Sequence, residues 1–170
     1  TREQVASIVQ ATGVTAIRGE LESALSSFST ERTLRISYFE EDEAFIRNLA
    51  RQAYYSVPAC ALGMPEVSVS IYPKSGRQRI VEILLEYPLE HSQLEKRRDE
   101  LNRELDRLAR DLTRDGRTAL ALEAARALLE EGTCDPEGGA TPYDFFDTGS
   151  ASGEGISLTF AALCQKLELS

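Results

Sequence analysis

The sequence predicts an α+β fold, in which a small, mainly antiparallel sheet with helices is followed by a helical region. Two observations predict it. Between residues 33 and 87, three segments alternate apolar and polar side chains as half-buried strands do. A segment whose apolar residues recur at helical spacing lies between the first and the second of them. From residue 91 onward, apolar residues recur mainly at helical spacing. We therefore expect a small α+β domain over residues 1–90 and a helical domain over residues 91–170.

Three helices are expected in the first domain. A capping-box pattern at Thr1 precedes apolar residues at helical spacing, which predicts a helix over residues 1–10. The third helix is expected over residues 41–56, because Pro58 ends its apolar periodicity. A short helix is expected between these two, where Leu21, Ala24, Leu25 and Phe28 recur at helical spacing.

Three strands are expected in the same domain. Residues 33–39 alternate in polarity, and so do residues 67–71 and 79–87. Residues 74–77 read Lys-Ser-Gly-Arg, a turn composition that joins the last two strands as a hairpin. The sheet is therefore expected to be mainly antiparallel.

The second domain is expected to begin with a long helix over residues 92–113. Ser92 and Glu95 form a capping box at its start. Its single apolar stripe predicts packing onto a neighbouring helix. The stripe consists of Leu94, Leu101, Leu105, Leu108 and Leu112.

Two further helices and an irregular loop follow. An Ala- and Leu-rich segment over residues 118–131 is expected to be helical and to stop at Gly132. Residues 133–142 contain several Gly and Pro residues, which predicts an exposed loop. The last helix is expected to run from Ser152 or Gly153 to Leu167, with Ile156, Phe160, Leu163 and Leu167 buried.

Charge and composition exclude several classes of function. The chain carries 28 acidic and 19 basic side chains, a net charge of −9, so we expect no nucleic-acid partner. No apolar run reaches the roughly 18 residues that span a bilayer, so no membrane span is expected. The three cysteines fit no zinc pattern, and we expect neither a metal nor a cofactor.

Residues 130–170 hold eight acidic side chains and one basic one. This composition is typical of a solvated surface or of a site for a cation or a basic partner.

Known catalytic motifs are also absent. His91 is the only histidine, so any Ser/His or Cys/His mechanism would have to use it. The glycine cluster over residues 149–155 lacks the lysine of a P-loop, and Leu158 occupies the third glycine position of a dinucleotide fingerprint. A nucleophile elbow would need serine where Ala151 stands.

Residues 143–164 read Y-D-F-F-D-T-G-S-A-S-G-E-G-I-S-L-T-F-A-A-L-C. They resemble the core of bacterial transglutaminase-like proteins, relatives of papain-like cysteine proteases. That family typically reads Tyr-x-x-Leu-x-x-Gly-x-x-x-Cys-Glu-Gly-Tyr-[Ala/Ser]-x-x-Phe-x-x-Leu. The resemblance implies that residues 91–170 are the N-terminal, helical part of such a core. It also implies an extracellular or cell-surface location, with a protein or cell-surface partner.

The departures from the family pattern bear on catalysis. Glu154 and Gly155 match the family's Glu-Gly pair, which places Gly153 at the nucleophile position. Glycine has no attacking atom, and Cys164 lies about 16 Å further along the helix axis. The family's His and Asp lie well downstream of the nucleophile, whereas His91 lies upstream. The resemblance therefore implies no catalytic residue in this chain.

Three functions follow as hypotheses. The first is a catalytically inactive transglutaminase-like protein with a binding or scaffolding role. The second is an adaptor or regulatory domain unrelated to transglutaminases, which docks a partner through the helix 92–113. The third is a hydrolase that uses Ser152 and His91. The first requires a core-packed helix that begins at Gly153, whereas a solvent-exposed coil there would favour the second.

Overall fold

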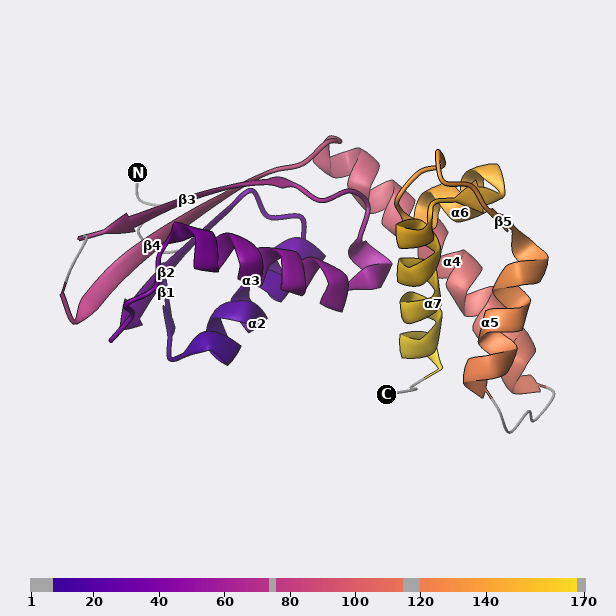
Figure 1. Ribbon diagram of the computed structural model, residues 1–170, viewed down its shortest axis with the longest axis horizontal. Coiled ribbons are helices and arrows are strands. Elements are labelled where there is room, and N and C mark those ends of the chain that lie inside the picture. The colour runs from indigo at the N-terminus through magenta and orange to yellow at the C-terminus, as the bar shows by residue number, and fades with distance from the viewer. Residues whose placement is uncertain (1–7, 74–75, 115–119, 168–170) are drawn as a thin grey trace. The chain divides into compact units, whose positions relative to one another are not determined.

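A computed structural model describes residues 8–73, 76–114 and 120–167. The chain forms two compact units (Figure 1). Unit 1 comprises the chain up to Val57 together with Met64–Pro88, and unit 2 comprises Pro58–Gly63 together with the chain from Leu89 onward. The division at residue 88 lies close to the predicted boundary at residue 90. The segment Pro58–Gly63, predicted within the first domain, instead belongs to unit 2.

Unit 1 is built on a four-stranded sheet in the order β1-β2-β4-β3. β2 pairs antiparallel with β4, and β4 pairs antiparallel with β3, whereas β1 runs parallel to β2. The expected α+β class with a mainly antiparallel sheet is thereby confirmed. The strands are β1 (Ile8–Ala11), β2 (Glu31–Ser37), β3 (Glu66–Tyr72) and β4 (Gln78–Glu86).

Two helices, α2 (Val14–Ser26) and α3 (Glu43–Ser56), cover one face of this sheet (Figure 1). They pack against each other and onto the strands, as the alternation in the strands requires. The Asp42 side chain caps α3 by accepting a hydrogen bond from the Phe45 N–H at 3.0 Å. The largest fully buried side chains of this core are Ile17, Leu21, Phe28, Leu34, Ile36, Ile46 and Ile83.

The predicted helix over residues 1–10 is wrong where the structure describes it, because Ile8–Ala11 is a strand. Residues 1–7 lie outside the described residues. The register pairs Ile8 with Thr33 and Ala11 with Ile36, so the segment extends the sheet beside β2. Ile8 and Val9 are β-branched, which favours a strand once a neighbouring strand is available for pairing.

Tyr87 links the end of β4 to α2. Its ionisation should lower the stability of unit 1 at alkaline pH. Its hydroxyl donates a hydrogen bond to the Ser29 carbonyl at 2.9 Å. Burial raises the pKa of Tyr87 to about 12, against a smaller opposing effect of Arg32. A folded-state pKa above the unfolded value of about 10 means that this contribution is present below pH 10 and is lost as the pH rises towards 12.

We therefore expect the unfolding free energy to fall between pH 10 and pH 12, and Tyr87→Phe to fall less steeply over that window. Urea titrations at successive pH values measure this difference. Tyr38→Phe is the matched control, because Tyr38 is 77% exposed. Equal slopes for wild type and Tyr87→Phe would contradict the assignment.

Unit 2 is mainly helical. The leucine stripe of α4 (His91–Arg114) is confirmed, since all five predicted leucines are at most 5% exposed. α4 packs against α5 (Leu120–Glu131), α6 (Pro142–Thr148) and α7 (Gly153–Lys166). A short 3₁₀ helix, Pro58–Cys60, packs against α4 and α7, and Ala61 and Leu62 beside it are buried. This packing is the reason that Pro58–Gly63 belongs to unit 2.

The start of α4 differs from the prediction. The helix begins at His91, so Ser92 lies in its first turn and does not cap it. The Leu94 N–H bonds to the Glu90 carbonyl at 3.0 Å, and the Glu90 N–H donates to the Gln93 Oε1 at 3.3 Å. The capping interaction therefore lies two residues earlier than the sequence pattern indicated.

α5 and α7 lie close to their predicted positions. α5 ends at Glu131, just before Gly132 as predicted, while residues 118–119 of its predicted start lie outside the described residues.

Among the described residues, no helix combines the length and the apolar character that a membrane crossing requires.

Candidate functional site

Gly153, the predicted nucleophile position, is the first residue of α7. Ser152 caps this helix, with its Oγ accepting a hydrogen bond from the Gly155 N–H at 3.3 Å. Gly153 is exposed, and a Cβ atom added to it would meet no other atom within 4 Å. The position therefore lies at a helix N-terminus with open space above it, where the helix dipole favours negative charge.

The chain before α7 is held by a short parallel ladder. β5 (Thr133–Cys134) pairs with β6 (Ser150–Ala151). The Asp135 N–H continues this ladder to the Ala151 carbonyl at 2.9 Å, and the Ser152 N–H donates to the Gly139 carbonyl at 3.0 Å. The loop predicted over residues 133–142 is thus exposed for most of its length but contains a strand and is anchored to the helix start.

Glycine at position 155 is required by this anchoring. A Cβ atom on Gly155 would lie 2.8 Å from the Gly139 oxygen and 2.9 Å from the Ala151 Cβ. The loop backbone therefore packs directly onto the first turn of α7. Gly153 and Gly155 are two residues apart but have opposite environments, one open and one closed.

α6 positions the residues between the two short strands. Thr141 caps it, and the Asp144 side chain bonds back to the Thr141 N–H at 3.3 Å, which completes a capping box with Pro142 at the first turn. Gly149 ends the helix in the left-handed conformation with a φ of 78°. α6 was not predicted from the sequence, although Thr141, Pro142, Asp144 and Gly149 are recognisable start and stop signals of a helix.

An apolar pocket of about 370 Å³ lies along α7. Its α7 residues follow Gly153 at spacings of three, four and seven residues, so they share the helix face that Gly153 begins. The volume falls within the roughly 300–1,000 Å³ of small-molecule and side-chain sites. The pocket is lined by Ala125, Leu128, Gly132, Cys134, Phe145, Ile156, Ser157 and Phe160.

This pocket corrects the predicted burial of α7. Ile156 and Phe160 were expected in the core but are only partly buried, because they line the pocket. The core face instead uses Leu158, Thr159, Ala162 and Leu163. Thr159 is fully buried, and its hydroxyl donates to the Gly155 carbonyl at 2.6 Å. The predicted burial of Leu163 and Leu167 is confirmed.

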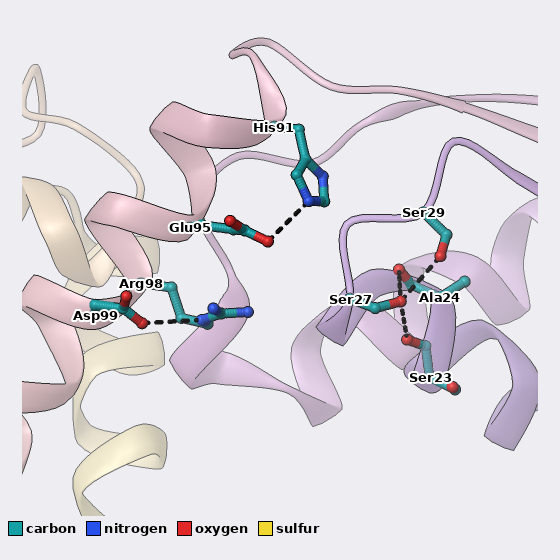
Figure 2. Close-up of polar contacts among 8 residues, drawn as sticks. All are labelled: Ser23, Ala24, Ser27, Ser29, His91, Glu95, Arg98 and Asp99. Carbon is teal, nitrogen blue, oxygen red and sulfur yellow. Dashed lines mark hydrogen bonds and ion pairs between the residues drawn. The ribbon is translucent and has the colours of Figure 1, made fainter.

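His91 and Ser152 have different partners in the structure. The His91 Nε2 lies 2.8 Å from the Glu95 Oε1, one turn along α4, and the side chain is 58% exposed (Figure 2). The Ser152 Oγ is engaged in capping α7. These contacts give the hypothesis of a Ser152–His91 hydrolase no support.

The three cysteines also differ from one another. Cys164 is partly buried on α7, and burial raises the pKa of its thiol, which disfavours the thiolate. Cys60 is partly buried, whereas Cys134 is exposed and lines the apolar pocket. Within the described part of the chain, no three His, Cys, Asp or Glu side chains form a group that could hold a metal ion.

A second pocket of about 280 Å³ lies between α4 and α6. Its walls carry charges of both signs, with Glu100, Glu104 and Asp147 beside Arg103. Tyr143 forms one wall, and the Arg97 guanidinium lies 4.6 Å from its ring centroid. Desolvation, followed by the nearby Asp147 and Glu100, raises the pKa of Tyr143. The mixed charge gives this pocket no preference for one class of ligand.

Comparison of the chain with protein-family models, with curated proteins and with solved structures finds no match. The transglutaminase-like resemblance therefore stays a prediction, carried by residues 143–164. The candidate site consists of the open position at Gly153 and the apolar pocket that begins one turn further along α7.

Proposed function

We propose that this protein is a catalytically inactive transglutaminase-like protein with a binding or scaffolding role. The observation that carries the proposal is the placement of Gly153. It is exposed, it begins a helix that packs in the core of unit 2, and it has room for a side chain that it lacks. A cysteine at such a position would be an accessible thiol at a helix N-terminus, which is how cysteine nucleophiles are activated.

The chemistry of that family requires groups that the described residues do not bring to Gly153. Acyl transfer needs a nucleophile and a base within hydrogen-bond reach of each other. Gly153 offers no nucleophile, and the His91 imidazole lies against Glu95 on α4. Loss of catalysis with retention of the surrounding fold leaves binding as the role.

The apolar pocket gives this binding role a location. It starts on the helix face that Gly153 begins, and Ile156 and Phe160 expose part of their apolar surface there. Burying such a surface against an apolar group of a partner is favourable at about 25 cal/mol per Å². A pocket beside a vacated nucleophile position is what a binding protein derived from an enzyme would keep.

Gly153→Cys tests the proposal. We expect the variant to fold with a stability within about 0.5 kcal/mol of wild type, because the added side chain enters open space. We expect iodoacetamide to alkylate the introduced thiol readily, because a helix N-terminus stabilises the thiolate. With a glutamine-containing peptide as acyl donor we expect no thioester, because no base is placed beside the new thiol.

Intact-protein and peptide mass spectrometry distinguish these products, and the wild-type chain reports the background from the three native cysteines. Formation of a thioester on the variant would contradict the proposed loss of the catalytic base. An introduced thiol that alkylates no faster than partly buried Cys164 would contradict the exposed, helix-start position.

The alternative proposal is an adaptor that docks a partner through the helix 92–113. The exposed face of α4 carries many charged side chains. Arg107 forms salt bridges to Glu104 at 2.8 Å and to Glu131 at 3.2 Å. A solvent-exposed coil at Gly153 would have favoured this alternative. The helix that begins there supports the transglutaminase-like proposal instead.

A further inference from the structure

β3 forms one edge of the sheet in unit 1, with β4 as its neighbour on the inner side (Figure 1). Among the described residues, no backbone hydrogen bond joins β3 to any segment other than β4. One row of its N–H and C=O groups therefore remains available for pairing with a further strand.

This edge lacks the devices that usually protect an edge strand. Natural edges carry lysines, internal prolines or bulges. β3 reads Glu-Val-Ser-Val-Ser-Ile-Tyr, and its register with β4 is uninterrupted from Glu66 to Tyr72. Pro65 and Pro73 flank the strand and limit any added ladder to these seven residues.

The inward face of β3 is also incompletely covered. Val67 and Val69 point towards the helices but stay partly exposed. The residues of β4 that pair with them, Leu85 and Ile83, are buried, at 2% and 0% exposed. An additional strand beside β3 would cover the two valines, which a polar ligand or an isolated ion would not.

We propose that β3 pairs with β3 of a second copy of this chain, antiparallel and centred on Val69. In this register Val69 lies opposite its own copy and Val67 lies opposite Ile71, so apolar side chains meet on the helix-covered face. On the other face Ser68 lies opposite Ser70. The only charged residue of the strand, Glu66, lies opposite Tyr72.

Self-complementarity favours a second copy over another occupant. Opposite residues in an antiparallel pair share a face, and the chosen register places apolar residues opposite apolar residues and serine opposite serine, with Glu66 and Tyr72 paired at the ends. No like charges face each other. The pairing relates the copies by a two-fold axis, the commonest symmetry of homo-oligomers, and joins the two sheets into one.

The net charge of −9 on each chain opposes association at low salt. We therefore expect dimer formation to strengthen as ionic strength increases. Sedimentation equilibrium of the full chain over a range of concentrations and salt should show a species with twice the 18.8 kDa of the monomer. A chain that stays monomeric at every concentration and salt overturns the proposal.

Charge substitutions on the exposed positions of β3 locate the interface. In Ser68→Lys/Ser70→Lys, lysine faces lysine twice in the proposed register, and we expect the dimer to weaken at least about tenfold. Mixing this variant with Ser68→Glu/Ser70→Glu should restore a heterodimer, because opposite charges then meet. Circular dichroism of each variant establishes that it is folded.

Leu84→Lys is the matched control. Leu84 is 53% exposed on the same sheet face but lies on β4, one strand away from the edge. It should leave the dimer intact. Loss of the dimer in Leu84→Lys, or no recovery on mixing the charge-swapped pair, would overturn edge pairing. A monomer that instead captures an extended peptide on β3 would replace the second copy by another partner and also overturn the proposal.

Discussion

Replacing Arg79 by methionine is expected to lower the unfolding free energy of unit 1 by about 2–4 kcal/mol. Arg79 is 9% exposed, and its guanidinium donates to three backbone carbonyls. These are Pro73 at 3.2 Å, Phe39 at 3.1 Å and Glu41 at 3.1 Å. Methionine fills a similar volume but leaves the carbonyls without their donors in a poorly hydrated place.

Chemical denaturation measures this loss, and two further variants interpret it. Arg79→Lys keeps the charge but cannot reach several carbonyls in one plane, so an intermediate loss is expected. Arg77→Met removes an exposed arginine two residues away and is expected to change stability by less than about 0.5 kcal/mol. A loss for Arg79→Met as small as that for Arg77→Met would show that the three hydrogen bonds contribute little.

Gly155→Ala is expected to lower the stability of unit 2 by about 1–3 kcal/mol, because an added methyl group would overlap a backbone oxygen and the side chain of Ala151. The Gly139 oxygen and the Ala151 Cβ are less than 3 Å from that methyl position. Neither atom is the end of a flexible side chain, so the loop and the helix start would have to move apart. Such a displacement would also disturb the cap formed by Ser152.

Gly153→Ala is the matched control for this variant, since it adds the same methyl group two residues earlier. Nothing lies within 4 Å of that position, and alanine restricts the unfolded chain more than glycine does. A stability equal to wild type or higher by up to about 1 kcal/mol is expected. Thermal or urea unfolding of both variants compares them directly, and equal losses would contradict the open environment of Gly153.

Helices with a long apolar stripe were predictable from the sequence, and so were the paired strands. The leucines of α4 and the alternation in β2, β3 and β4 repeat over enough residues to identify the type of element. The start of α7 was predicted to within a residue, because Ser152 followed by glycines and an apolar periodicity is an explicit helix start.

Short elements were not predictable in the same way. β1 spans four residues and its segment also matches helical spacing, so only the presence of β2 beside it decides its conformation. β5 and β6 span two residues each and exist because they pair with each other.

One part of the candidate site was predictable from the sequence and the other part was not. From the sequence pattern of residues 143–164, the resemblance predicted that Gly153 stands at the nucleophile position. The apolar pocket could not be predicted, because it depends on which face of α7 the neighbouring helix α5 and strand β5 leave uncovered. Ile156 and Phe160 have the spacing of core residues, and only packing shows that they line a pocket.

The sequence by itself determined the α+β class, the long helices, the hairpin and the absence of a side chain at position 153. Each of these depends on residue type and on spacing along the chain. The tertiary structure alone decided the parallel strand β1, the closed environment of Gly155 beside the open one of Gly153, and the unprotected edge of β3. These features depend on contacts between distant segments, and no local pattern contains the distances that define them.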